Sequence, residues 1–425
     1  MRSPVCAQPD TTPSRVPPSR GSTSSGAAAI SAVVDPREPS RRSSRPSGEH
    51  LGTDVLTEDP APGASVQHTA TPRPAARVIA VIPAHNEEIG IAQTIDSLRR
   101  QTQAPDHIIV AADNCSDGTV EIARAMGVEV LETRDNAAKK AGALNQGLAL
   151  VLPDLQPHDV VLMMDADSRL NQDFVEIGMR YFEYWPQRGG ISGSYVAADH
   201  PSRVALLQKI EYTQGLRAVH RRAGRIHVLS VAAAIFTVEA LRRVAEMRGS
   251  KVLPGVEGQV YDESSLTEDY ELTVALKRVG YDPRCAADCI VDTDVMPTWR
   301  EWRIQRLRWQ RGTLETLLTY GFVEHTRKAW GVQLWTYFRT IIPLLMIIIW
   351  SYALSFEEVA FHPFWLLIIP VFMLDQLIAT WQAGVRGRIY AALIVPLWVY
   401  ETYQSFAYWK ALRLALHGGE KEWLT

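Results

Sequence analysis

The chain has 425 residues, of which 46% are hydrophobic, and its formal net charge is −3. This length is enough for one large domain with an appendage, or for two domains. Because no global positive field would attract nucleic acid, we exclude nucleic acid as a partner.

Residues 1–75 are rich in Pro, Ser, Thr, Ala and Gly, with scattered Arg and no aromatic side chains. A segment of this composition buries too little apolar surface to offset its chain entropy, so we predict that it is disordered. Its one apolar stretch, residues 27–34, is short and far from the N-terminus, which is not typical of a signal peptide.

Residues 77–310 alternate short apolar runs with helical patterns. The apolar runs predict buried parallel strands, and the segments between them predict crossover helices. This alternation indicates an α/β domain with a doubly wound sheet, whose ligand lies beyond the carboxyl ends of the strands. The predicted strands are residues 77–82, 107–112, 128–132 and 160–164, and the predicted helices are residues 89–100, 119–126 and 141–152.

Polar clusters follow three of these strands. His85-Asn86-Glu87-Glu88 follows the first strand, Asp113-Asn114 the second and Asp165-Ala166-Asp167 the fourth. No G-x-x-x-x-G-K-[ST] loop is present, and no G-x-G-x-x-G follows the first strand, so the sequence supports neither an ATPase nor a dinucleotide-binding protein.

The cluster Asp165-Ala166-Asp167 is the most informative of the three. Two carboxylates one residue apart after a buried strand suit a hard divalent cation, which would bridge diphosphate oxygens. The pattern alone is weak, because a second instance, Asp292-Thr293-Asp294, occurs without an evident role.

The four cysteines, Cys6, Cys115, Cys285 and Cys289, are too scattered for a disulfide framework. Cys285 and Cys289 could begin a metal site, but no second pair or His cluster accompanies them. We interpret them as reduced structural thiols.

The last third of the chain contains three apolar runs, residues 335–354, 361–381 and 389–409, with aromatic side chains at their ends. Their length and aromatic ends predict transmembrane helices; three buried helices of a large domain are the alternative. Asp375 and Glu401 lie within two of the runs. Each is expected either to face another helix or a polar path, or to reach an interface.

Loop charges predict the orientation of these spans. Arg327, Lys328 and Arg339 lie on the N-terminal side of the first span, Arg339 within the first turns of the run. Residues 355–360 carry no Lys or Arg, and the next loop carries Arg386 and Arg388. The positive-inside rule therefore places the N-terminal domain in the cytoplasm. The basic residues of the tail, residues 410–425, conflict with three spans, and the topology of that tail stays open.

Five motifs occur in a fixed order and carry a family resemblance. The sequence resembles family-2 inverting glycosyltransferases, and among them the membrane polysaccharide synthases that make cellulose, chitin, hyaluronan and poly-N-acetylglucosamine. The resemblance implies a GT-A-like mixed sheet followed by interfacial and transmembrane helices. The motifs are Val81 to Glu88, Ala112 to Thr119, Asp165-Ala166-Asp167, Thr267-Glu268-Asp269 and Gln305-Arg306-Leu307-Arg308-Trp309.

The resemblance also implies roles for individual residues. Asp167 matches the metal ligand for Mg²⁺ or Mn²⁺, and Asp269 matches the general base. Gln305, Arg308 and Trp309 match a motif that closes over donor and acceptor. The positions that match donor-binding residues are Pro83, Ala84, Asn86, Glu87, Asp113, Lys140 and Asp165.

Elementary chemistry agrees with these roles. Asp269 would accept the proton of an acceptor hydroxyl, and its place at a helix N-terminus would favour the charged form of the carboxyl. In isolation, Thr267-Glu268-Asp269 is more typical of a simple helix cap than of a catalytic motif. Arg308 and Trp309 share a helix face with Gln305, and suit diphosphate and a sugar ring respectively.

Two segments have the character of interfacial helices. Residues 299–311 are dense in Trp and Arg and suit a membrane surface. Residues 202–222 are either a second interfacial helix or a helix packed against the domain.

These observations predict a membrane-bound inverting glycosyltransferase. The donor would be a nucleotide sugar, expected to be a UDP sugar, and the acceptor a growing glycan or a lipid at the cell membrane. The alternatives are a non-processive transferase that adds one sugar to a lipid or protein, and a silent membrane scaffold, against which the intact carboxylates argue. The expected parts are residues 1–75 (disordered), 76–312 (cytoplasmic catalytic domain), 313–334 (interfacial connection), 335–409 (three transmembrane helices) and 410–425 (tail).

Overall fold

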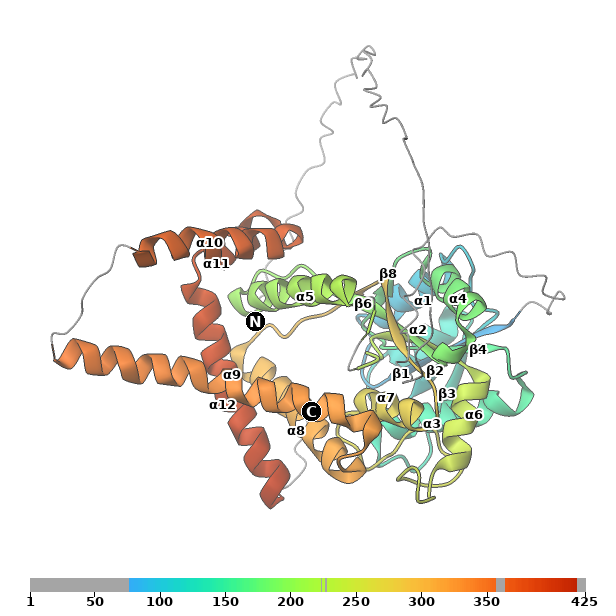
Figure 1. The fold of residues 1–425 in the computed structure, drawn as a ribbon. Helices are drawn as coiled ribbons and strands as arrows, with labels where there is room; N and C mark the ends of the chain where they lie inside the picture. Colours follow the sequence, from blue (N-terminus) through green and yellow to red (C-terminus); the bar gives the residue numbers. More distant parts are fainter. Residues whose placement is uncertain (1–75, 223, 226–227, 357–363, 419–425) are drawn as a thin grey trace, which may run out of the picture. The chain divides into compact units, whose positions relative to one another are not determined.

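A computed structural model of the chain describes residues 76–222, 224–225, 228–356 and 364–418 (Figure 1). The disorder predicted for residues 1–75 concerns a segment outside the described residues, as does the end of the tail, residues 419–425.

The strands of the described chain form one eight-stranded mixed sheet in the order β3-β2-β1-β4-β7-β6-β8-β5. Strands β1 to β3 and β4 run parallel, as expected, whereas β7 is antiparallel to both β4 and β6. The bounds are β1 Val78–Ala84, β2 His107–Ala112, β3 Glu129–Glu132, β4 Val160–Met164, β5 Arg169–Leu170, β6 Gly190–Ala197, β7 Ala233–Thr237 and β8 Arg284–Thr293.

Helices cover both faces of this sheet, and successive residues of the interior strand β1 point to opposite sides. Every residue of β1 is buried; Ile79 and Val81 belong to one core, and Val78, Ala80 and Ile82 belong to the other. Helices α3 (Lys139–Val151), α6 (Val238–Met247) and α7 (Glu268–Arg278) pack into the first core, and α1 (Ile91–Arg99), α2 (Thr119–Ala125) and α4 (Phe174–Tyr184) into the second. The doubly wound α/β fold is confirmed.

The remaining helices extend from this domain (Figure 1). Helix α5 (Arg203–Arg221) contacts β6 on the domain and also α11, so the packed interpretation of residues 202–222 holds. The C-terminal helices are α8 (Trp299–Tyr320), α9 (Glu324–Ser355), α10 (Phe364–Ala379), α11 (Gly384–Ala392) and α12 (Val395–His417).

Helix α8 begins where the sequence indicates. Its N-cap residue, Thr298, accepts a hydrogen bond from the backbone N–H of Glu301, whose carboxylate accepts one from the Thr298 N–H in return. The helix does not end near residue 312, where we expected the domain to end, but continues to Tyr320. The expected connection at residues 313–334 is therefore divided between α8 and α9.

One described helix, α9, is long and apolar enough to cross a membrane, and α10 with α11 would add a second if that pair, bent by 68°, is one span. The third expected run, residues 389–409, is divided between α11 and α12 by a turn at Leu393 and Ile394. Three spans are therefore not confirmed. Asp375 and Glu401 both line a cavity of about 700 Å³ beside α5.

Candidate active site

Two adjoining cavities lie beyond the carboxyl ends of the parallel strands. The first has a volume of about 580 Å³ and the second about 480 Å³. Loops after β1, β2 and β4 line the first cavity, whereas Asp269 and Trp309 line only the second. Both cavities share the side chains of Lys140, Asp165, Asp167, Glu268, Met296, Gln305 and Arg308.

The first cavity gathers most of the expected donor-binding residues. Pro83, Ala84, Glu87 and Asp113 line it together with the shared side chains. The Asp113 carboxylate is buried and accepts hydrogen bonds from Thr133 Oγ1 at 2.7 Å and Asn114 Nδ2 at 3.0 Å. These donors fix its rotamer at the end of β2.

Asn86 is the exception among the expected donor-binding residues. It lines neither cavity. Its backbone has a φ of +57°, a left-handed conformation that Asn tolerates better than most residues. Its Oδ1 accepts a hydrogen bond from the Ser116 backbone N–H at 2.8 Å. Asn86 therefore holds two cavity loops together instead of facing the cavity.

Negative charge is concentrated where these loops meet. Burial, together with Asp167 and Asp165, raises the pKa of Glu87 to about 7. Burial and Asp165 raise the pKa of Asp167 to about 6. Asp294, from the Asp-x-Asp pair without an assigned role, lines the second cavity and adds to both shifts. Such mutual repulsion suits a cation, which would stabilise the ionised carboxylates.

The carboxylates of Asp165 and Asp167 suit a divalent ion whose other ligands come from a bound substrate and water. Among the described residues, no three His, Cys, Asp or Glu side chains form a ligand cluster. Mg²⁺ is commonly held by one or two carboxylates with the remaining sites filled by phosphate and water. Asp165 and Asp167 supply that number of carboxylates.

Lys140 lies at the junction of the two cavities. Its Nζ is 2.5 Å from Asp165 Oδ1 and 3.1 Å from Glu268 Oε1. Burial lowers the pKa of Lys140, but Asp165 and Glu268 more than offset that effect, so the net pKa is raised and the ammonium stays charged. Glu268 is buried and its pKa is nevertheless lowered, because Lys140 and Arg308 stabilise its charge.

Asp269 lies in the first turn of α7 and faces the second cavity. Its Oδ1 accepts a hydrogen bond from the Tyr270 N–H at 2.7 Å. We expected the helix N-terminus to favour the charged form. Instead, burial and the neighbouring Glu268 raise the pKa of Asp269 to about 6, so desolvation and like charge outweigh the helix terminus. A carboxyl with this pKa suits proton acceptance near neutral pH.

Thr267 is the N-cap residue of α7, but its side chain makes no capping hydrogen bond. The alternative that Thr267-Glu268-Asp269 is only a helix cap therefore loses its main support. A Cβ at Gly312 would lie 2.5 Å from Thr267 Oγ1, so glycine is needed there for α8 to approach α7.

Helix α8 carries the expected closing motif to both cavities. Gln305 and Arg308 line both, whereas Trp309 lines the second. Arg308 Nη1 donates to the Leu266 carbonyl at 3.2 Å, which links α8 to the segment before α7. Every site residue expected from the sequence, except Asn86, thus lines one of the two adjoining cavities.

The sequence matches the family model of Glycosyl transferase family 2 over residues 79–245. The chain carries a family 2 glycosyltransferase domain. This match and the mixed sheet confirm the expected family and enzyme class. The matched residues contain the first three motifs. The last two motifs lie beyond them, in α7 and α8, and the structure places their side chains at the same two cavities.

Two proteins named as a glycosyltransferase or a polysaccharide synthase are similar in sequence to this chain. Probable glycosyltransferase YdaM of Bacillus subtilis is 28% identical over 293 residues, which are 65% of this chain and 65% of the relative. Poly-beta-1,6-N-acetyl-D-glucosamine synthase of Staphylococcus aureus is 24% identical over 283 residues, 63% of this chain and 62% of the relative. The match thus spans less than two thirds of the length of either relative.

A solved structure shares the fold of the glycosyltransferase domain. The mannosyltransferase PcManGT from Pyrobaculum calidifontis, in complex with GDP-Man and Mn²⁺, superposes with a TM-score of 0.52 and 16% identity. The similarity covers 83% of this chain and 91% of that chain.

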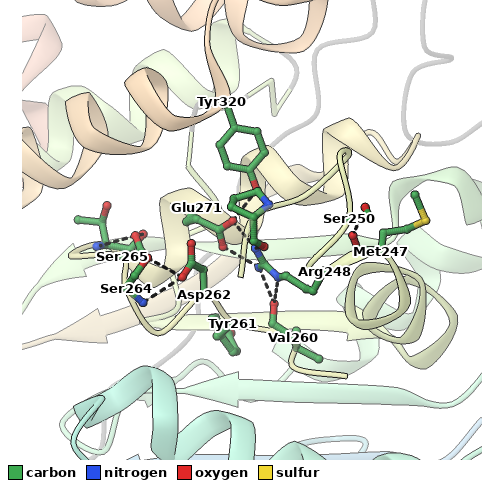
Figure 2. A network of polar contacts seen from close by, with 12 residues as sticks. Met247, Arg248, Ser250, Val260, Tyr261, Asp262, Ser264, Ser265, Glu271 and Tyr320 are labelled. Carbon is green, nitrogen blue, oxygen red and sulfur yellow. Dashed lines mark hydrogen bonds and ion pairs between the residues drawn. The ribbon is translucent and has the colours of Figure 1, made fainter. Parts of the chain in front are cut away.

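A buried ion pair supports the helix that carries Asp269 (Figure 2). Arg248 Nη1 and Nη2 donate to the two Glu271 carboxylate oxygens at 2.5 and 2.7 Å, and Tyr320 donates its hydroxyl to Glu271. Arg248 also donates to the carbonyls of Val260 and Pro254. The network ties the loop before α7 and the end of α8 to α7 itself.

Sequence reasoning missed this network and the position of Glu268. Arg248 and Glu271 carry no motif signal, because their pairing depends on the fold of the loop between α6 and α7. Glu268 and Asp294 had weak signals in the sequence: Glu268 precedes the expected base, and Asp294 belongs to the second Asp-x-Asp. Cys285 and Cys289 are buried and free, which agrees with their interpretation as structural thiols.

Proposed function

We propose that this chain is a membrane-bound inverting glycosyltransferase. It moves a sugar from a nucleotide-diphosphate sugar, expected to be a UDP sugar, to an acceptor hydroxyl and so builds a poly- or oligosaccharide. The observation that carries the proposal is the shared wall of the two cavities, where Asp165, Asp167, Lys140 and Arg308 lie between a nucleotide-sized space and Asp269.

The reaction is a single displacement at the anomeric carbon. The donor lies in the first cavity with its diphosphate against the shared side chains. The acceptor hydroxyl approaches from the second cavity, and its oxygen bonds to the anomeric carbon while Asp269 accepts its proton. The bond from that carbon to the diphosphate oxygen breaks, and the electron pair leaves with the nucleoside diphosphate.

Charge on the leaving diphosphate needs stabilisation. Arg308 offers a planar donor fork to phosphate oxygens. Asp165 and Asp167 would hold Mg²⁺ or Mn²⁺, and the bound ion would neutralise diphosphate charge. The solved mannosyltransferase of similar fold contains Mn²⁺ with its nucleotide sugar.

The acceptor and the membrane belong to the same proposal. The staphylococcal relative is named as a poly-N-acetylglucosamine synthase, which supports a polysaccharide product. Apolar helix α9 supports membrane attachment, and the positive charge before its apolar part supports a cytoplasmic catalytic domain at the cell membrane. Tyr408 of α12 lines the second cavity, so the C-terminal helices adjoin the acceptor side.

A donor panel tests the proposal. Membranes containing the full chain are incubated with UDP-glucose, UDP-N-acetylglucosamine, UDP-glucuronate and GDP-mannose, with Mg²⁺, Mn²⁺ or EDTA. We expect nucleotide release from one donor, dependent on metal, with a product of inverted anomeric configuration. No release from any donor would reject the proposal. Product length then separates a polymerase from a transferase that adds one sugar.

A further inference from the structure

Arg306, which the reaction above does not use, is buried in a polar network that joins three helices. Its side chain lies in α8, and the residue is 4% exposed. Its Nη2 donates to Glu211 Oε2 of α5 at 2.7 Å. The Tyr400 hydroxyl of α12 donates to the same oxygen at 2.5 Å and accepts from Trp302 Nε1 at 2.7 Å.

The Arg306 guanidinium also lies against the Trp309 indole. Its Cζ is 4.5 Å from the centroid of that ring, and 5.8 and 6.0 Å from the rings of Trp302 and Tyr212. These distances fall within the range of cation–π attraction, which strengthens when the pair is desolvated. The position of the cation therefore helps to fix the position of the indole.

The charge of Arg306 is secured by Glu211. Burial lowers the pKa of Arg306, but Glu211 and the surrounding tyrosines more than offset that effect, so the net pKa is raised. The Glu211 side chain is 33% exposed and lines the cavity of about 700 Å³ beside α5. One end of the pair thus reaches water, while the other is enclosed by aromatic rings.

The network lies on the acceptor side of the site. Arg306, Trp309 and Tyr212 line the second cavity with Asp269, and none of the three lines the first cavity. Glu211 and Tyr400 line the separate cavity between α5, α10 and α12. The ion pair therefore forms part of the wall between the acceptor cavity and the C-terminal helices.

We propose that Arg306, held by Glu211 of α5 and Tyr400 of α12, is a positioning residue that orients Trp309 for the acceptor sugar. This inference rests on the proposed function. Loss of the pair lets the indole rotate away from the acceptor, while the donor site keeps its geometry. Donor cleavage then continues with water as acceptor, and transfer to sugar falls.

Three variants of the full chain test this role in detergent-solubilised membranes. Arg306→Gln removes the cation. Tyr400→Phe removes the hydroxyl that bonds to Glu211 and Trp302, while it keeps the ring. Arg303→Gln is the matched control, because Arg303 lies one turn earlier in the same helix, is exposed and lines neither cavity. The probes are UDP for binding, and the donor of the panel that the wild-type chain consumes.

The decisive readout is the ratio of nucleotide released to sugar incorporated into product. In Arg306→Gln we expect incorporation to fall by about 10- to 100-fold, the scale on which small misplacements act, with the affinity for UDP unchanged. Tyr400→Phe should raise the same ratio by a smaller factor. Arg303→Gln should match the wild type.

Three results would overturn the inference. If release and incorporation fall together in Arg306→Gln and in Tyr400→Phe, the network is only structural. If both variants keep the wild-type rates of release and of incorporation, Trp309 does not depend on the pair. If the wild type consumes no donor, both this inference and the proposed function fail. If the wild type is active and the variants behave otherwise than expected, only this inference fails.

Discussion

The ammonium of Lys140 lies 3.1 Å from Glu268 Oε1, although 127 residues separate the two positions in the chain. The same ammonium is 2.5 Å from Asp165 Oδ1. One side chain therefore joins the Asp-x-Asp loop to the helix that carries Asp269. The contact therefore fixes the position of the Asp-x-Asp loop relative to the helix that carries the proposed base.

Replacing Lys140 with Met should impair both binding and turnover. Lys140 lowers the pKa of both Glu268 and Asp269, so its loss raises the pKa of both carboxyls and alters the proposed base. We expect transfer to fall by about 100-fold or more, because removal of one partner leaves a buried charge unpaired. UDP affinity and initial rates measure the effect, and Lys140→Arg should recover part of the loss. Wild-type rates in Lys140→Met would contradict this role.

The two Asp-x-Asp pairs provide a matched test of the metal site. Asp167→Ala should weaken UDP binding in the presence of Mn²⁺ and leave the metal-free affinity almost unchanged, because Asp167 supplies a carboxylate ligand. Asp292→Ala should bind as the wild type does, since Asp292 is exposed in β8 and lines neither cavity. Calorimetry with and without Mn²⁺ measures both. An unaltered metal response in Asp167→Ala would reject the ligand assignment.

The raised pKa of Asp269 predicts the pH dependence of transfer. Its ordinary value of 3.8 is raised to about 6, so the base form is lost as the pH falls through 6. Below that value kcat/KM should drop by about 10-fold per pH unit, as for a single required base. The neighbouring Glu268, whose pKa is lowered, stays ionised over this range. Rates of donor consumption between pH 5 and 8 test this expectation, and a flat profile would rule it out.

The ion pair of Arg248 and Glu271, shown in Figure 2, should contribute strongly to stability although neither residue lines the cavities. The side chains of Arg248 and Glu271 are 0% and 1% exposed, and Arg248→Met should cost about 3–5 kcal/mol because it leaves Glu271 charged and buried. Replacing both by Met should cost less than the single change. Arg243→Met breaks an exposed pair with Glu246 and should shift the Tm little. Thermal unfolding in detergent ranks the variants; equal Tm values for Arg248→Met and Arg243→Met would refute the argument.

The parallel half of the sheet was predictable because each strand is an apolar run followed by polar residues. β1, β2, β3 and β4 lie within two residues of their predicted bounds. The other half, which mixes parallel and antiparallel pairs, was not, because β5 has only two residues and the pairings of β6 to β8 depend on tertiary contacts.

Motif order was a better guide to the site than local rules were. The side chains of Asp113, Asp167 and Arg308 line the adjoining cavities, as the motifs predicted. A motif marks residues that contact the ligand in related proteins, whatever their distance in the chain. The helix-terminus rule gave the wrong direction for Asp269, because its burial and Glu268 could not be read from the sequence. The third apolar run is not a single helix, because Leu393 and Ile394 form a turn within it, and its prediction as a span is not confirmed.

The most direct test of the central claim is the Asp269→Asn variant of the full chain, compared with the wild type for UDP binding and for transfer. The substitution keeps the shape of the side chain and removes its capacity to accept a proton. The account predicts unchanged UDP affinity and a loss of transfer of about 10²- to 10⁴-fold, the usual contribution of a general base. Transfer at the wild-type rate, or an equal loss of UDP binding, would contradict it.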